Sequence, residues 1–232
     1  MKPEVFDLGL IDFQKAYDFQ KEIFGRVKNG KTCGALILCR HNPVVTLGRS
    51  ANKNNLLVSA EELKAKGIRV YALERGGDIT YHGPGQLTLY PVLDLRYLKK
   101  DIHWFLRKME SAIIGFLADF GVEARQRVGF TGAWIGQRKI ASIGIAIRNW
   151  ITFHGLSVNI EKNDLKNFEL IRPCGMDIKM ISLEEASGRV IDSKIAAERI
   201  IWNFRRTLDN PVLINNRQGF NSRNNLLTLK CS

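Results

Sequence analysis

Cys174 is the residue in this sequence best placed to act as a nucleophile. It lies in the tetrapeptide Arg-Pro-Cys-Gly at residues 172–175. A loop thiol beside a cation has its pKa drawn below the free value of about 8.5, which makes the reactive thiolate available. The other cysteines, Cys33, Cys39 and Cys231, flank an apolar run or lie near the C-terminus, where free cysteine usually serves as a small hydrophobic residue.

Lys139 is a candidate for moving protons. It begins the run Lys-Ile-Ala-Ser-Ile-Gly-Ile at residues 139–145, which is otherwise small and apolar. Such a lysine is either a solvated cap at the start of a strand or a desolvated amine, and desolvation lowers a lysine pKa toward the range used in proton transfer. Residue type alone favours the solvated alternative.

Residues 75–91 form a glycine-rich segment that could surround a ligand. They read Arg-Gly-Gly-Asp-Ile-Thr-Tyr-His-Gly-Pro-Gly-Gln-Leu-Thr-Leu-Tyr-Pro and lie between two apolar runs. The pair Gly76-Gly77 lets the backbone approach a ligand closely, and residues 83–85 predict a sharp bend beside His82. The alternative is a glycine-rich hairpin with a structural histidine.

A match to a phosphate-binding loop is rejected on its context. Residues 25–32, Gly-Arg-Val-Lys-Asn-Gly-Lys-Thr, fit the pattern G-x-x-x-x-G-K-[ST]. That loop follows a strand and opens a helix whose N-terminal amides hold phosphate. Here the segment is expected to end a helix and precede a strand, so we interpret it as a polar turn.

Composition places the chain among ordinary globular proteins. With 232 residues, 45% of them hydrophobic and 25% charged, it can bury a core, which excludes global disorder, a collagen and a disulfide miniprotein. No run approaches the roughly 20 apolar residues of a membrane span, and the N-terminus has no signal-peptide pattern, so neither a membrane location nor export is expected. The cysteines show no zinc or disulfide spacing, and no metal is expected.

Hydrophobic spacing predicts an α+β fold with a mixed, largely antiparallel sheet covered by helices. We expect one catalytic domain over residues 1–210 and an Asn-rich basic tail over 211–232. Helices are expected over 12–27, after the capping box at Ser59, and over 101–120 and 193–208. The expected strands begin near residue 5 and continue at 35–39, 44–47, 68–73, 87–93, 128–135, 139–149 and 151–160.

Five stretches together resemble the lipoyl(octanoyl) transferase family. They are residues 41–49 (His-Asn-Pro-Val-Val-Thr-Leu-Gly-Arg), the glycine-rich segment 75–91, residues 139–144, residues 153–159 (Phe-His-Gly-Leu-Ser-Val-Asn) and residues 173–175 (Pro-Cys-Gly). The resemblance covers about residues 35–190. One departure is Gly132-Ala133-Trp134, where a bulkier aliphatic residue is expected before the tryptophan.

The resemblance implies a cytoplasmic enzyme of lipoate biosynthesis with a fold similar to the catalytic domain of biotin and lipoate protein ligases. Such an enzyme moves an octanoyl group from acyl carrier protein to a lysine of a lipoyl domain through a cysteine thioester, without a cofactor. The implied acceptors are the lipoyl domains of 2-oxoacid dehydrogenase complexes and the glycine cleavage H protein. Cys174 would carry the acyl group, Lys139 would lower the pKa of its thiol, and His154 would support the site.

The resemblance also implies an acyl-binding set. Its members are Arg75, Gly76, Gly77, Asp78, Ile79, Thr80, Tyr81, His82, Ser142, Ile143, Gly144, Gly155, Leu156 and Ser157. An octanoyl chain needs an apolar slot, for which we expect Ile143, Leu156 and Tyr81 to supply walls. A landing surface for acidic partner proteins is expected at Arg40, Arg49, Lys53 and Arg148.

Two other functions fit parts of the sequence. An ATP-dependent lipoate or biotin protein ligase on a similar fold would keep the lysine and the glycine-rich segment but would not need Cys174. A basic nucleic-acid-binding module fits the net charge of +12. Against the second, the aromatic residues are expected at buried positions and are not interleaved with basic ones, so no nucleic-acid partner is expected.

Overall fold

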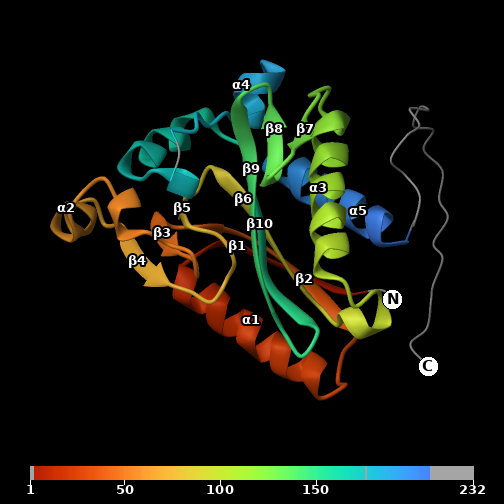
Figure 1. Ribbon diagram of the computed structural model, residues 1–232. Coiled ribbons are helices and arrows are strands. Elements are labelled where there is room, and N and C mark those ends of the chain that lie inside the picture. Colours follow the sequence, from red (N-terminus) through yellow and green to blue (C-terminus); the bar gives the residue numbers. More distant parts are fainter. Residues whose placement is uncertain (1–2, 176, 210–232) are drawn as a thin grey trace.

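The fold is built from one large and one small β-sheet. The computed structural model describes residues 3–175 and 177–209, apart from the side chain of Cys174, so the tail expected over 211–232 lies outside the described residues (Figure 1). The strands are β1 Glu4–Ile11, β2 Gly34–His41, β3 Val44–Leu47, β4 Arg69–Ala72, β5 Ile79–His82, β6 Gln86–Leu93, β7 Arg125–Arg127, β8 Phe130–Ile135, β9 Arg138–Arg148 and β10 Ile151–Asn159.

Helices begin where side chains cap them. The α-helices are α1 Phe13–Lys28, α2 Ala60–Ala65, α3 Ile102–Asp119, α4 Leu183–Ser187 and α5 Ser193–Asp209, and the 3-10 turns are η1 Lys53–Asn55, η2 Leu95–Tyr97, η3 Lys162–Leu170 and η4 Pro173–Gly175. Asp12 accepts a hydrogen bond from the Gln14 amide at the start of α1, and Ser59 and Glu62 form the expected capping box of α2. The predicted positions of the three long helices are confirmed to within one or two residues at each end.

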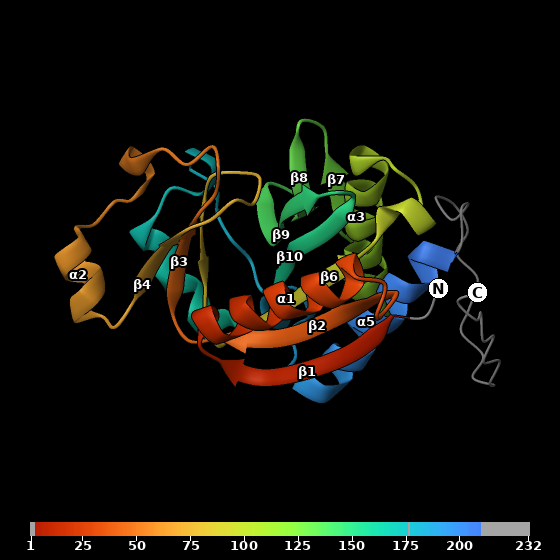
Figure 2. The same cartoon turned by 90° about the horizontal axis from the view of Figure 1, so that it is seen from below.

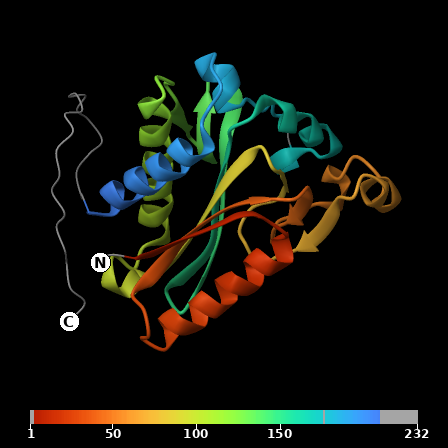
Figure 3. The same ribbon diagram turned by 180° about the vertical axis from the view of Figure 1, so that it is seen from behind.

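The large sheet has the strand order β1-β2-β6-β10-β9-β8-β7. Its pairs are antiparallel except β1–β2, which is parallel, so the predicted mixed and largely antiparallel sheet is confirmed. Every residue of the central strand β10 is buried, including the polar residues Thr152, His154, Ser157 and Asn159. Helix α1 packs on one face of this sheet, and α3 and α5 pack together on the other (Figures 1 and 3).

The small sheet, β4-β3-β5, was not predicted as a separate layer. It lies to one side of the large sheet together with α2 (Figure 2). Strand β3 runs parallel to β4 and antiparallel to β5. Strand β5 arises inside the glycine-rich segment, where only a turn was expected. In the part of the chain that the structure describes, each helix is too short or too polar to span a bilayer.

Candidate active site

A cavity lies between the two sheets, at the glycine-rich segment. The large sheet contributes residues of β6, β9 and β10, and the small sheet contributes β3 and β5. The loop between β4 and β5 and the turn η4 close its sides. Its lining residues are Phe13, Thr46, Leu73, Arg75, Gly77, Asp78, Ile79, Thr80, His82, Thr88, Tyr90, Thr131, Lys139, Ser142, Ile143, Gly144, His154, Gly155, Leu156, Ser157 and Pro173.

The cavity gathers most of the acyl-binding set expected from the sequence. Twelve of its fourteen members line it, together with Lys139 and His154. Gly76 is an exception because its amide donates to the Ile145 carbonyl at 2.8 Å, which ties the loop to β9. Gly144 lets this loop come close, since a Cβ there would lie 3.0 Å from the Gly76 carbonyl oxygen.

Tyr81 is the second exception, and its expected role as a wall of the slot is wrong. Its ring lies in the core of the small sheet against Phe168, and its hydroxyl donates to Asp164 at 2.9 Å and accepts from Asn167 at 2.8 Å. Side chains alternate along a strand, so Tyr81 faces away while its neighbours Thr80 and His82 reach the cavity. Burial and the nearby Asp164 carboxylate raise the pKa of Tyr81.

Arg75 holds the glycine-rich loop in shape. Its side chain is buried, and its guanidinium donates to the carbonyls of Thr46 at 2.7 Å, Asp78 at 2.8 Å and Gly76 at 3.0 Å. A guanidinium offers five donors in a rigid fork, which suits it to collecting several carbonyls. The loop that lines the cavity is therefore fixed to β3.

The turn that carries Cys174 docks on the same loop through Asn55. The Asn55 side-chain amide donates to Asp78 at 2.5 Å, and its backbone carbonyl accepts from the Arg172 amide at 2.7 Å. The Gly175 amide donates to the Arg172 carbonyl at 3.1 Å and closes the turn η4. No sequence pattern selects Asn55, because its partners Asp78 and Arg172 lie more than twenty residues away along the chain.

Lys139 is buried, with 4% of its surface exposed, so the solvated alternative is wrong. Residues 179–181 pair with the backbone of Lys139. The Lys139 amide donates to the Lys179 carbonyl at 2.9 Å, and the Ile181 amide donates to the Lys139 carbonyl at 3.1 Å. Lys139 and Pro173, which precedes Cys174, both line the cavity. The structure thus brings together two segments that are 35 residues apart in sequence.

Two buried histidines adjoin the cavity in their neutral form. Burial lowers the pKa of His41 to about 4. Burial, followed by the nearby His41 and Arg75, lowers the pKa of His82 well below its usual value. The Nε2 of His41 accepts a hydrogen bond from the Tyr90 hydroxyl at 2.6 Å, and its Nδ1 donates to the Ile11 carbonyl at 3.3 Å.

His154 lies in the middle of β10 with an unusual backbone. Its φ is +57°, a left-handed conformation that a residue with a side chain rarely adopts within a strand. Its ring stacks on Tyr17 of α1, and its Nε2 lies 3.4 Å from the Glu74 carboxylate. The nearby His154 imidazole, and the Tyr17 hydroxyl, which donates to the carboxylate at 2.7 Å, lower the pKa of Glu74 to about 2. These three residues connect α1, β10 and the glycine-rich loop.

Several other lining residues were not in the predicted set. Thr46, Thr88 and Tyr90 fall inside stretches that carried the family resemblance, so that signal could have found them. Phe13 and Leu73 gave no signal, because each is an ordinary member of its own helix or loop. The segment of residues 25–32 ends α1 and precedes β2, as expected, which confirms that it is not a phosphate-binding loop.

Metal ligands do not converge in the described part of the chain. Among residues 3–175 and 177–209, the structure contains no group of three or more His, Cys, Asp or Glu side chains that could hold an ion. Cys39 is buried beside His41, and burial raises the pKa of its thiol, which opposes thiolate formation.

Comparison with known proteins identifies the family to which this fold and site belong. The model of the lipoyl protein ligase A/B catalytic domain matches residues 12–205. An octanoyltransferase of Thermoanaerobacter sp. is 39% identical over 225 residues, covering 93% of this chain and 98% of the relative. An octanoyltransferase of Clostridium kluyveri is 40% identical over 205 residues, covering 88% and 87%. The chain belongs to the lipoyl protein ligase A/B catalytic domain family.

Solved structures show the same fold at low sequence identity. A lipoate-protein ligase A crystallised with ATP superposes with a TM-score of 0.76 at 18% identity, covering 90% of this chain and 86% of that one. A biotin protein ligase from Aquifex aeolicus superposes with a TM-score of 0.54 at 11% identity, covering 90% and 71%. The expected similarity to the catalytic domains of biotin and lipoate ligases is confirmed.

Proposed function

We propose that this protein is an octanoyltransferase of lipoate biosynthesis that works through a thioester on Cys174. The observation that carries the proposal is the convergence of three segments on one cavity: the turn that holds Cys174, the strand that holds Lys139 and the glycine-rich loop. Octanoyltransferases that align over most of the chain support the substrate.

In the first step, the Cys174 thiolate attacks the carbonyl carbon of the octanoyl thioester. A new carbon–sulfur bond forms, the bond to the donor thiol breaks, and the leaving thiolate takes a proton from the Lys139 ammonium. Exchange of one thioester for another costs little free energy, which suits cysteine to this role. An ammonium beside the thiol stabilises the thiolate before the attack.

In the second step, the neutral amine of the acceptor lysine attacks the Cys174 thioester. A carbon–nitrogen bond forms, the carbon–sulfur bond breaks, and the proton released by the amine returns to Lys139. The enzyme regains its thiolate and ammonium, and the product is an amide. One buried amine at Lys139 therefore serves as acid in one half-reaction and as base in the other.

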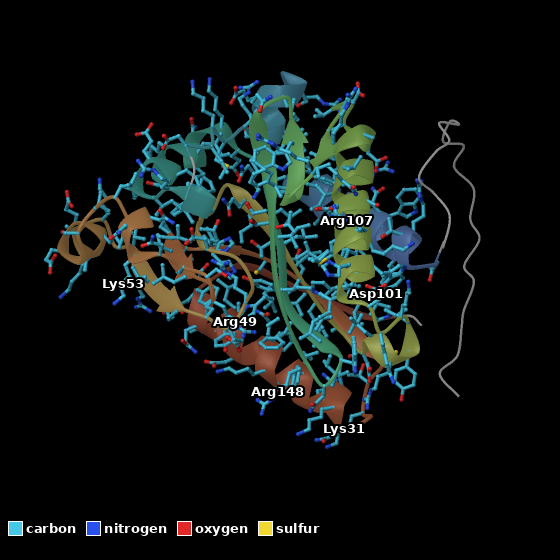
Figure 4. All side chains as sticks on the ribbon, in the orientation of Figure 1. Lys31, Arg49, Lys53, Asp101, Arg107 and Arg148 are labelled. Atoms are coloured by element: carbon cyan, nitrogen blue, oxygen red, sulfur yellow. The ribbon has the colours of Figure 1, made fainter. Side chains whose placement is uncertain are left out.

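The donor and acceptors follow from the same proposal. We assign acyl carrier protein as donor, and the lipoyl domains of 2-oxoacid dehydrogenase complexes and the glycine cleavage H protein as acceptors, in the cytoplasm. Arg49, Lys53 and Arg148 have exposed side chains that could meet acidic partners (Figure 4). Arg40 does not belong with them, because it lies 3.5 Å from Glu161 and lines a different hollow with Cys39.

The test is a search for the acylated enzyme. The protein is mixed with octanoyl-acyl carrier protein in the absence of ATP, and its intact mass is measured. We expect a gain of one octanoyl group on the peptide that contains Cys174, no gain in Cys174→Ala, and an unchanged gain in the control Cys33→Ser. Strict dependence of octanoyl transfer on ATP would contradict the proposal and favour a ligase, and an adduct that survives in Cys174→Ala would contradict the role of Cys174.

A further inference from the structure

The indole of Trp134 lies against the amine of Lys139. The two residues pair across strands β8 and β9, and the Nζ of Lys139 lies 5.3 Å from the centre of the indole ring. Trp134 has 2% of its surface exposed and Lys139 has 4%. A cation over an aromatic face is stabilised by the ring quadrupole, and more strongly where water is excluded.

The backbone of Lys139 is fixed from two further directions. Its amide and carbonyl pair with Lys179 and Ile181 of the segment that follows η4. Asn159 of β10 donates to the Ile181 carbonyl at 3.1 Å and to the Lys139 carbonyl at 3.5 Å. These bonds hold the main chain of Lys139, and the ring of Trp134 lies beside the side chain that extends from it.

Gly132 makes room for this arrangement. A Cβ at Gly132 would lie 3.0 Å from the Cε of Lys139 and 2.3 Å from the Ala141 carbonyl oxygen, and its φ of +117° favours glycine. The Gly132 amide donates at 3.1 Å to Glu110, a fully buried residue of α3. Helix α3 therefore holds β8 where its glycine and its tryptophan both meet the lysine side chain.

We propose that Trp134 is the positioning residue of Lys139: its indole face holds the side chain over the cavity and stabilises the ammonium. This inference rests on the proposed function, in which that ammonium stabilises the Cys174 thiolate. It also assigns a role to Gly132 and Trp134, the outer residues of the Gly-Ala-Trp stretch whose middle residue, Ala133, departs from the family pattern.

The test lowers the electron density on the face of the Trp134 ring and leaves the shape of the side chain nearly unchanged. Difluorotryptophan is installed at position 134, because fluorine withdraws electron density from the face of the ring while the side chain keeps nearly the same volume. The matched control is difluorotryptophan at position 202, where the indole of α5 lies 4.7 Å from the guanidinium of Arg206 and is remote from the cavity. Trp134→Leu is the larger perturbation, and thermal unfolding shows whether each variant is folded.

The readout is the pH dependence of iodoacetamide alkylation at Cys174, followed by mass spectrometry of its peptide. We expect the alkylation midpoint of the position-134 analogue to rise by about half a pH unit, and kcat/KM for octanoyl transfer to fall about threefold. Trp134→Leu should lose about tenfold in kcat/KM, with the loss in kcat. The position-202 control should match the parent.

An unchanged midpoint and an unchanged kcat in the folded position-134 analogue would overturn the proposal, because a tryptophan with a merely structural role predicts that result. The alkylation experiment uses no octanoyl substrate. It therefore separates failure of this inference from failure of the proposed function, which appears instead as absence of the octanoyl adduct in the parent protein.

Discussion

Acidification from pH 7.5 to pH 5 should destabilise this protein through two buried histidines. The folded-state pKa of His41 is about 4, and that of His82 is also well below the ordinary value of 6.5. His41 is therefore largely neutral in the folded protein at pH 5, and the lowered pKa of His82 acts in the same direction, while the same residues in the unfolded chain bind protons. Stability linked to such groups is present above about pH 6.5 and is lost as the pH falls toward the folded-state pKa.

The size of the effect follows from these values. With an unfolded pKa of about 6.5 and a folded pKa of about 4, His41 loses about 2 kcal/mol of stability between pH 7.5 and pH 5. His82 adds a loss in the same direction, because burial holds its folded-state pKa well below its ordinary value. Glu74 contributes little in this range, because its pKa of about 2 places its effect between about pH 4.5 and pH 2.

The assay is urea unfolding at pH 7.5, 6 and 5, followed by circular dichroism. The parent should lose more than the roughly 2 kcal/mol that His41 contributes, His41→Gln should lose about 2 kcal/mol less than the parent, and His82→Gln should also lose less than the parent, whatever their stability at pH 7.5. His103→Gln removes an exposed imidazole from α3 and should keep the parent's slope. An equal slope in the parent and both buried variants would refute the reasoning.

Two further predictions concern the glycine-rich loop. Glu74→Gln should lower the free energy of unfolding by about 1 kcal/mol at pH 7, a figure reduced because the carboxylate is half exposed. The variant should also lose less stability than the parent when the pH falls below about 4.5. An unchanged urea midpoint would show that Tyr17 and His154 do not hold the loop through Glu74. Gly144→Val should abolish acyl-enzyme formation while the protein stays folded, because its side chain would meet the Gly76 carbonyl at the cavity wall; a normal yield of adduct by intact mass would refute this placement of the loop.

The sequence predicted those parts of the fold that local patterns determine. The helical spacing of Phe13, Tyr17, Phe24 and Val27 predicts α1 without any distant partner. In the structure the buried face of α1 carries Phe13, Ala16, Gln20, Ile23 and Val27. Strand β5 was missed because four residues between glycines carry too little pattern, and its pairing with β3 depends on a contact about 35 residues away.

The candidate site divides in the same way. Motifs located the loops around Lys139 and His82, but motif membership could not tell which side chains face the cavity. Tyr81 shows the difference: it belongs to the same motif as Thr80, yet strand alternation turns it into the core of the small sheet. Phe13 and Asn55 could not be found at all, because their roles arise only when separate segments meet.

Hydrogen-bond directions then link the lysine to the buried histidine across the sheet. Asn159 donates its side-chain amide to the Ile181 carbonyl, so its oxygen accepts from Gln86 at 3.1 Å. The oxygen of Gln86 is left to accept from His82 at 3.2 Å, which places the proton of the neutral imidazole on Nδ1. Since Asn159 also binds the Lys139 carbonyl, the tautomer of His82 and the backbone of Lys139 are set by one chain of amides. Neutral His82 is therefore left with an unprotonated Nε2 as its hydrogen-bond acceptor, and its lowered pKa preserves that acceptor in the folded protein as the pH falls below the ordinary histidine value of about 6.5.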